Sequence, residues 1–71
     1  MLVYVDKEKL VNMRKGMNLS QRKLSLKSGL PANAVQRMET EDMRVSSLRL
    51  SAVAAALGCE TTNLIRTYNT D

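Results

Sequence analysis

The chain of 71 residues has room for one domain, and its apolar content of 44% is typical of a folded globule rather than a disordered tail. One cysteine and no histidine exclude an internal disulfide, the usual zinc site and the commonest general base, so we expect neither a cofactor nor an enzyme. The net charge of +4 is uneven: residues 1–38 hold eight Lys and Arg against two Asp and Glu, whereas residues 39–71 hold three against five. A basic first half fits a polyanionic partner and, equally, an ordinary solvated surface.

No segment has the length of a signal-peptide core or of a membrane span. The apolar start, residues 1–5 (MLVYV), and the longest later apolar run, residues 52–57, are both too short. The lone Cys59 is expected to pack as a small buried apolar residue in a reducing environment. We therefore expect a cytoplasmic protein with no membrane partner.

Apolar spacing and helix-capping residues predict five helices within one domain that spans residues 1–71. The predicted helices cover about residues 6–15, 20–28, 31–39, 47–57 and 61–68. Asp6 is a plausible N-cap of the first helix, Gly16 is expected to end it, and Gly58 is expected to end the fourth. Residues 3–5 are expected to pack as an extended arm.

The second and third predicted helices are joined by a very short connection, GLP. Ser20 is a good N-cap for the second helix, and Gly29 is expected to stop it. Pro31 can occupy the first turn of the third helix, where its missing N–H is no loss. Because Gly29 stops one helix and Pro31 starts the next, the pair is expected to meet at a steep angle, with Leu30 filling the corner. Ser25 is small enough to let another helix approach closely.

The fourth predicted helix carries the clearest amphipathic stripe, with apolar residues at i, i+3, i+4 and i+7. These residues are Leu50, Val53, Ala54 and Leu57. Ser46 or Ser47 is the expected N-cap of this helix. The fifth helix would present Leu64, Ile65 and Tyr68, which either complete the core of the monomer or form a dimer surface.

Two helices with a short glycine-containing turn define a helix-turn-helix motif. The stretch "LSQRKLSLKSGLPANAVQRME", followed after a loop by "LSAVAAALG", resembles the lambda-repressor-like, Cro/C1-type (XRE) helix-turn-helix family over roughly residues 6 to 66. The resemblance implies an all-α, compact five-helix domain that binds a double-stranded DNA operator. It also implies an ion pair between Arg14 and Glu39, which would fix the angle between helices.

The resemblance places the DNA contacts on the helix pair. Base edges would meet the outward positions of the third helix, which are Ala32, Asn33, Gln36 and Arg37. Gln21 would meet the DNA backbone, and Arg22, Lys23, Lys27 and Arg44 would neutralise phosphates. For each basic residue taken alone, a solvated surface charge is an alternative.

Three features depart from the family pattern. Ala32 stands where many relatives have a longer base-reading side chain. Glu41 and Asp42 place two carboxylates in a loop that is expected to approach phosphates. Leu26 is apolar at a position that is usually exposed and polar, and Met43 and Val45 could extend it into a patch that binds protein.

Two hypotheses follow. In the first, the chain is a sequence-specific regulator of the Cro or repressor type, a possible homodimer that acts in a phage genetic switch. In the second, it is a modulator or anti-repressor that binds a phage repressor protein instead of DNA. The partner-binding residues would then be Leu26, Ala32, Asn33, Gln36 and Met43. Neither hypothesis requires a small-molecule ligand.

Overall fold

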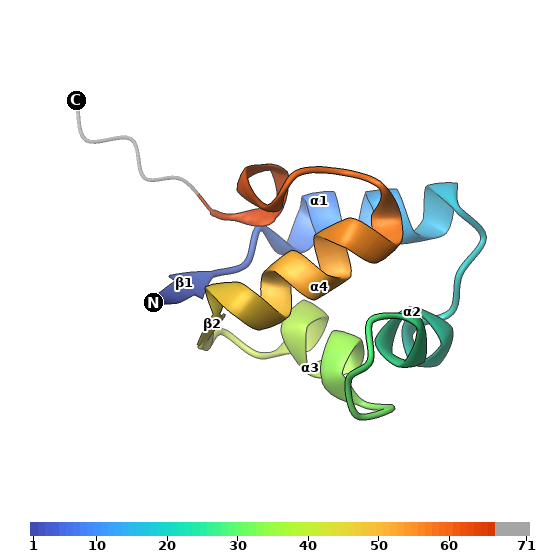
Figure 1. The fold of residues 1–71 in the computed structure, drawn as a ribbon, viewed down its shortest axis with the longest axis horizontal. Helices are drawn as coiled ribbons and strands as arrows, with labels where there is room; N and C mark the ends of the chain where they lie inside the picture. The colour runs from blue at the N-terminus through green and yellow to red at the C-terminus, as the bar shows by residue number, and fades with distance from the viewer. Residues whose placement is uncertain (67–71) are drawn as a thin grey trace.

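The computed structural model describes residues 1–66, which fold into four α-helices, a two-stranded sheet and a short 3-10 helix (Figure 1). The elements in chain order are β1 (Leu2–Tyr4), α1 (Lys7–Gly16), α2 (Gln21–Lys27), α3 (Ala34–Thr40), β2 (Arg44–Ser46), α4 (Ser47–Leu57) and the 3-10 helix (Thr61–Leu64). The helical class is as expected, but the prediction of a five-helix, all-α domain is wrong in detail. No helix within residues 1–66 is long and apolar enough to cross a bilayer.

The predicted fifth helix is a 3-10 turn of four residues. It ends at Leu64, because Ile65 turns to an extended conformation and forms an antiparallel bridge with Val5. Leu64 is fully buried and therefore completes the core, while Ile65 is half-buried. Tyr68, the third apolar residue predicted for this helix, lies outside the described residues.

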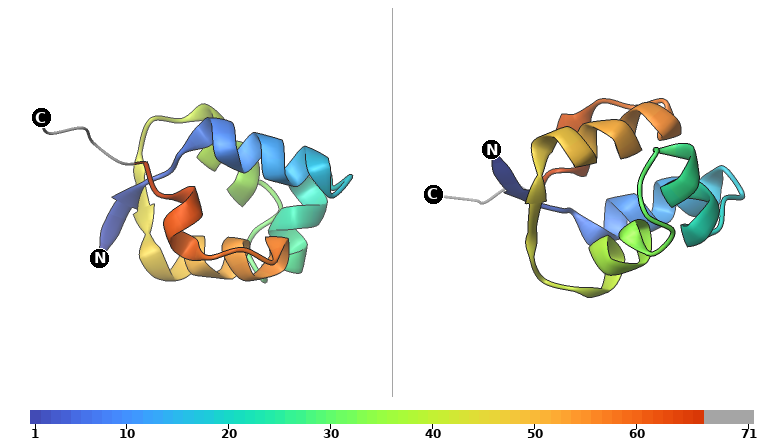
Figure 2. Two further views of the ribbon diagram at one scale, coloured as in Figure 1. Left: turned by 90° about the horizontal axis from the view of Figure 1, so that it is seen from above. Right: turned by 60° about the horizontal axis from the view of Figure 1, so that its bottom comes forward.

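The expected N-terminal arm is a strand. β1 runs antiparallel to β2, with Val3 opposite Val45, and the backbone N–H of Arg66 donates to the carbonyl of Tyr4 at 2.8 Å. The N-terminal strand and the end of the described chain therefore lie side by side, as both views in Figure 2 show. β-branched valines at alternate positions of such a ladder point to the same face, and here Val5 and Val45 enter the core.

For α1, the predicted start agrees with the structure, whereas the predicted end does not. The side chain of Asp6 accepts a hydrogen bond from the N–H of Lys9 at 3.2 Å, so the predicted N-cap is confirmed. Gly16 is the last residue of α1, but the prediction that it serves as the C-cap is wrong, because Met17 occupies that position. The chain reverses instead at Asn18, whose φ of 56° is in the left-handed region that Asn tolerates better than most residues.

The core is aliphatic, as the composition predicted. All four residues of the α4 stripe are buried: Leu50, Val53, Ala54 and Leu57. They pack with Leu10 of α1, Leu24 of α2 and Val35 and Met38 of α3. Ser46 caps α4, and Gly58 ends it with a φ of 73°, so both predicted ends are confirmed. This packing leaves α2 and α3 on one side of the molecule (Figure 1).

Candidate nucleic-acid interface

The corner between α2 and α3 is built by local backbone contacts. Ser20 caps α2, as predicted. The helix ends at Lys27, with Ser28 at the C-cap, and Gly29 next to it takes a φ of 73°. The N–H of Leu30 then donates to the carbonyl of Ser25 at 3.0 Å, which is a common way to end a helix. The prediction for Pro31 is wrong: it lies one turn before α3, and its carbonyl accepts from the N–H of Ala34 at 2.9 Å.

Ser25 explains why α3 starts late and without a local cap. Asn33 stands at the N-cap position, but its side chain makes no capping bond. Instead, the hydroxyl of fully buried Ser25 accepts a hydrogen bond from the N–H of Val35 at 2.9 Å. The same hydroxyl donates to the carbonyl of Gln21 at 2.8 Å. The side chain of Ser25 on α2 thus supplies the acceptor for a backbone N–H in the first turn of α3, and this bond sets the distance between the two helices.

A second polar contact holds the C-terminal end of α3. Glu39 accepts from Nε of Arg14 at 2.7 Å and from Nη2 of the same guanidinium at 3.1 Å. Gln21 donates to Glu39 at 2.8 Å, and Arg14 donates to the carbonyl of Leu19 at 2.9 Å. The side chains of Arg14 and Glu39 are only 11% and 4% exposed. Such bidentate, desolvated pairs are directional, so this network fixes α3 against α1 and the start of α2.

Held in this way, α3 presents polar side chains to solvent. Asn33 and Gln36 are both exposed, as the DNA-binding hypothesis requires. Ala32 is half-buried in the turn before the helix. Gln21 is also half-buried, and one of its amide N–H groups already serves Glu39. Among the residues predicted to meet base edges, Asn33 and Gln36 therefore offer exposed side-chain donors and acceptors.

The loop after α3 is acidic, yet its carboxylates are internally paired. The carboxylate of Glu41 accepts a hydrogen bond from Nε of Arg37 at 3.2 Å, and this ion pair is exposed to solvent. Asp42 lies 3.1 Å from Arg66 and 3.9 Å from Lys7. These contacts offset much of the repulsion that the sequence led us to expect between this loop and phosphates, and they also hold Arg37 beside the loop.

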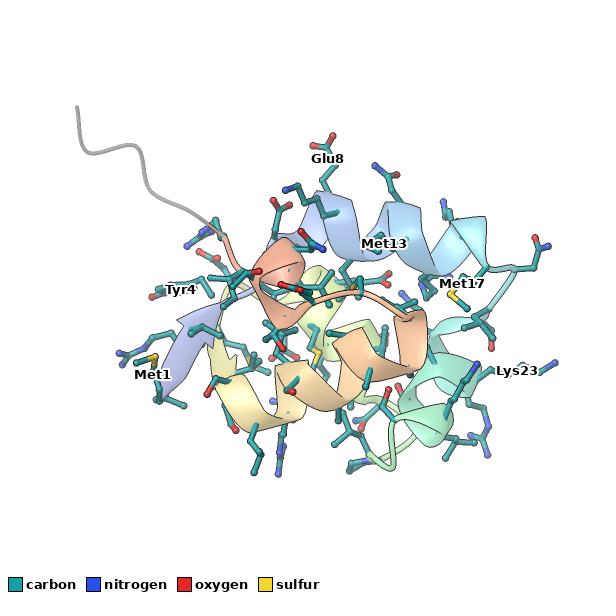
Figure 3. The ribbon with its side chains drawn as sticks, turned by 45° about the horizontal axis from the view of Figure 1, so that its top comes forward. Met1, Tyr4, Glu8, Met13, Met17 and Lys23 are labelled. Atoms are coloured by element: carbon teal, nitrogen blue, oxygen red, sulfur yellow. The ribbon has the colours of Figure 1, made fainter. Side chains whose placement is uncertain are left out.

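The predicted cations lie exposed around α3. Arg22, Lys23 and Lys27 project from α2, and Arg44 projects from β2. Lys23 extends outward at the end of the molecule opposite Met1 (Figure 3). None of the four forms an ion pair within residues 1–66. Their charges are thus available to a polyanion.

The apolar patch proposed for a protein partner does not form as predicted. Leu26 is 53% exposed on α2, but Val45 is in the core and Met43 is half-buried. Met43 instead lines a groove of about 340 Å³ beside α3, to which Leu26 does not contribute. The groove, called the α3–α4 groove below, takes its walls from α3, the loop after it, β2 and the first turn of α4, with Leu2 and Pro31 completing it.

Sequence reasoning missed two features of this site. The bond from Ser25 to Val35 joins residues ten positions apart, and the only signal for it was a small polar residue on an inward position. Arg49 lines the α3–α4 groove together with Asn33 and Arg37. No local pattern on α4 distinguished Arg49 from an ordinary surface charge.

Comparison with known proteins agrees with this geometry. No curated protein matches the chain. The helix-turn-helix family model HTH_3 matches residues 10–64, which include α2, α3, α4 and the greater part of α1. This family consists of DNA-binding domains rather than enzymes. The chain therefore belongs to the Cro/C1-type (XRE) helix-turn-helix family.

Proposed function

We propose that this protein is a transcriptional regulator that reads a specific operator with Asn33, the N-cap residue of α3, and Gln36 within α3. The observation that carries the proposal is a contrast between two sides of α3. Contacts of Ser25 and Glu39 fix the inner side of the helix, whereas Gln36 and the N-cap residue Asn33 are exposed. Amide side chains bond bidentately to adenine in the major groove, which an α-helix can enter. A helix with a fixed position can align such groups with base edges without a large entropic cost.

The surrounding cations supply the sequence-independent part of the binding. Arg22 and Lys23 lie in the first turn of α2, beside the N-terminus that in helix-turn-helix proteins approaches a phosphate. Because a single domain meets only one half-site, we propose that two copies bind a palindrome. The resemblance to phage regulators favours a role in a genetic switch, and a divergent repressor gene beside this reading frame would support that role.

The proposal is tested by selecting bound duplexes from a random pool and measuring their affinity by fluorescence anisotropy. Asn33→Ala and Gln36→Ala should each reduce the preference for the selected site over random duplex, by about 1–3 kcal/mol per lost base contact. Arg22→Ala should weaken selected and random duplexes alike. Lys9→Ala, which removes an exposed charge from α1, serves as the control. Recovery of no consensus, together with no preference at low salt, would reject the proposal.

The repressor-binding hypothesis retains one supporting observation, the exposed Leu26 on α2. In that case the protein would co-elute with a repressor and bind DNA poorly alone. Leu26→Asp should abolish co-elution while leaving the fold intact, because the side chain is outside the core. Unchanged co-elution by the folded Leu26→Asp protein would remove this hypothesis.

A further inference from the structure

The solvent side of α4 is almost uncharged, unlike the solvent sides of α1 and α2. Arg49 is the only charged residue among the 11 residues of α4. Leu48 is 81% exposed, and Ser51 and Ala55 are exposed as well. At 3.6 residues per turn, these three side chains lie away from the buried stripe of the helix. The face therefore has the composition of a packing surface, although no element within residues 1–66 covers Leu48 or Ala55.

This face carries both a protrusion and a recess. Leu48 projects from the first turn of α4, just after the N-cap residue Ser46. Further along the helix lies an open recess of about 400 Å³, which is lined by Ser51 and Ala55 of α4 and by residues 59–62 after it. Positions 48 and 55 are two turns apart, or about 10 Å along the helix axis. A large apolar side chain is thus displayed beside a recess that is lined mainly by small side chains and can receive it.

The charges at the two ends of this face are opposite. Arg49 lies at the N-terminal end of α4, and Glu60 lines the recess just beyond its C-terminal end. Both residues are exposed, and neither forms an ion pair with another residue of the described range 1–66. If a second α4 packed here in the antiparallel direction, each Arg49 would lie near the Glu60 end of the other helix. A parallel arrangement would bring like charges together instead.

We propose that two copies of the chain pair through the exposed faces of α4, in the antiparallel direction, so that Leu48 of each copy enters the recess of the other. A two-fold contact brings the same surface of both copies together, so the surface must fit itself. This face does, because it supplies both the protrusion and the recess as well as both charges. Ser51 and Ala52 would lie at the crossing point, where small side chains let helix axes approach to about 8 Å.

The arrangement places both reading helices on one side of the pair. In the left view of Figure 2, α4 runs along one edge of the molecule and α1 along the opposite edge, so the exposed face of α4 points away from α1. The two-fold axis that exchanges antiparallel helices is perpendicular to both helices and to the line that joins them. In Figure 1 that direction leads from α4 towards α3. Both copies of α3 therefore lie on the same side, as a palindromic duplex requires.

The inference deepens the proposed function, because it names the surface that pairs the two copies, but the pairing itself needs no DNA. One helix face is small compared with the roughly 1,200–2,000 Å² that stable interfaces bury, so the pairing should be reversible. Sedimentation velocity of the full chain without DNA, from low to high micromolar concentration, is the test. The natural chain should pass from monomer to dimer and stop there, because a two-fold contact closes on itself.

Two substitutions on the face should prevent pairing. Leu48→Asp should raise the dissociation constant of the dimer by about tenfold or more, since it removes the central apolar anchor. An acidic residue in the first turn of a helix is compatible with the helix dipole, so thermal unfolding of the monomer should be unchanged. Ala55→Glu should have a similar effect, because it fills the recess with a charged side chain. Leu26→Asp is the matched control, because it makes the same change at another exposed leucine.

A charge exchange tests the direction of the helices. Arg49→Glu should weaken the dimer by about fivefold, the effect of an exposed ion pair, because it places carboxylates together at each end. Combining Arg49→Glu with Glu60→Arg should restore the natural dissociation constant. If the combined change does not restore pairing, the antiparallel arrangement is wrong.

The remaining outcomes separate this inference from the proposed function. A natural chain that stays monomeric, that grows beyond a dimer, or that loses pairing equally in Leu26→Asp and Leu48→Asp would overturn the inference. If such a chain still selects a consensus duplex, the proposed function stands alone. A dimer that is sensitive to Leu48→Asp but selects no consensus would leave the inference standing and reject the proposed function.

Discussion

Glu39 and Glu41 are two residues apart, and each pairs with an arginine, but the two pairs belong to different regions of the molecule. The Arg14–Glu39 pair is almost completely buried, and the carboxylate of Glu39 also accepts a hydrogen bond from Gln21. The Arg37–Glu41 pair lies in solvent, with its side chains about half exposed. The contacts on the inner side of α3 therefore hold the helix in place. The charged side chains on its outer side and in the following loop remain accessible to solvent.

The largest expected effect is on the inner pair. Glu39→Ala would leave the guanidinium of Arg14 buried without its partner, so the free energy of unfolding should fall by about 3–5 kcal/mol in urea denaturation. Glu41→Ala is the matched control at the exposed pair and should cost less than about 1 kcal/mol. If Glu39→Ala destabilises so far that it does not fold, the double change Arg14→Met with Glu39→Leu should restore folding, because it removes both buried charges. Equal effects of the two glutamate substitutions would contradict the distinction between the two sides.

The next effect concerns Ser25. In the Ser25→Ala protein the buried N–H of Val35 loses its acceptor, and the free energy of unfolding should fall by about 1–3 kcal/mol. Ser28→Ala is the control, because the hydroxyl of Ser28 only adds a second donor to the carbonyl of Leu24, which already accepts from a backbone N–H. A Ser28→Ala cost as large as that of Ser25→Ala would show that the bond between α2 and α3 has no special weight.

A smaller effect is expected from the exposed Arg37–Glu41 pair. This effect concerns DNA binding and not folding. Glu41→Gln frees Arg37 and removes a negative charge near the proposed phosphate path, so affinity for a random duplex should rise by up to about fivefold, the equivalent of one exposed ion pair. The gain should disappear in an Arg37→Ala background, as a double-mutant cycle measured by anisotropy would show. An equal gain in that background would mean that Glu41 acts through general repulsion alone.

The smallest effect concerns Cys59, which is half-buried at the end of α4. Burial raises the pKa of the Cys59 thiol, so iodoacetamide should react with it more slowly in the native chain than in urea at neutral pH. The raised pKa contributes stability below the pKa of the unfolded thiol, and this contribution is lost as pH rises through the folded value. The labelling rate also distinguishes the Arg14–Glu39 pair from the Arg37–Glu41 pair. Glu39→Ala should increase the rate because it destabilises the fold, whereas Glu41→Ala should leave the rate unchanged.

Much of the fold was predictable where the signal was local. Ser20, Gly29 and Gly58 mark helix ends through the conformations that they favour, and the α4 stripe predicted its buried face correctly. The errors at Gly16 and Pro31 arose where a neighbouring contact overrode a local preference. α1 continues through Gly16 because Asn18 makes the turn, and α3 starts after Pro31 because Ser25, ten residues earlier than Val35, supplies its cap.

In the candidate site, too, some features were predictable from local sequence and others were not. The exposed positions of Asn33 and Gln36 followed from the helix-turn-helix pattern, and the structure has them exposed. The β1–β2 sheet and the α3–α4 groove did not follow. Three-residue strands give too little alternation to detect, and the paired residues of β1 and β2 are 40 or more positions apart in the chain. For the same reason Val45, which looked like part of an exposed patch, proved to be a core residue.

The amino-acid sequence by itself determined the helical character, the positions of most helix ends and the family of this protein, because these depend on residues close together in the chain. Only the tertiary structure decided which charges are buried, which carboxylates are already paired, and that Arg49 shares a groove with Asn33. Pairing and burial are set by contacts between distant segments, and the cost or gain of each charge depends on how much water those contacts remove.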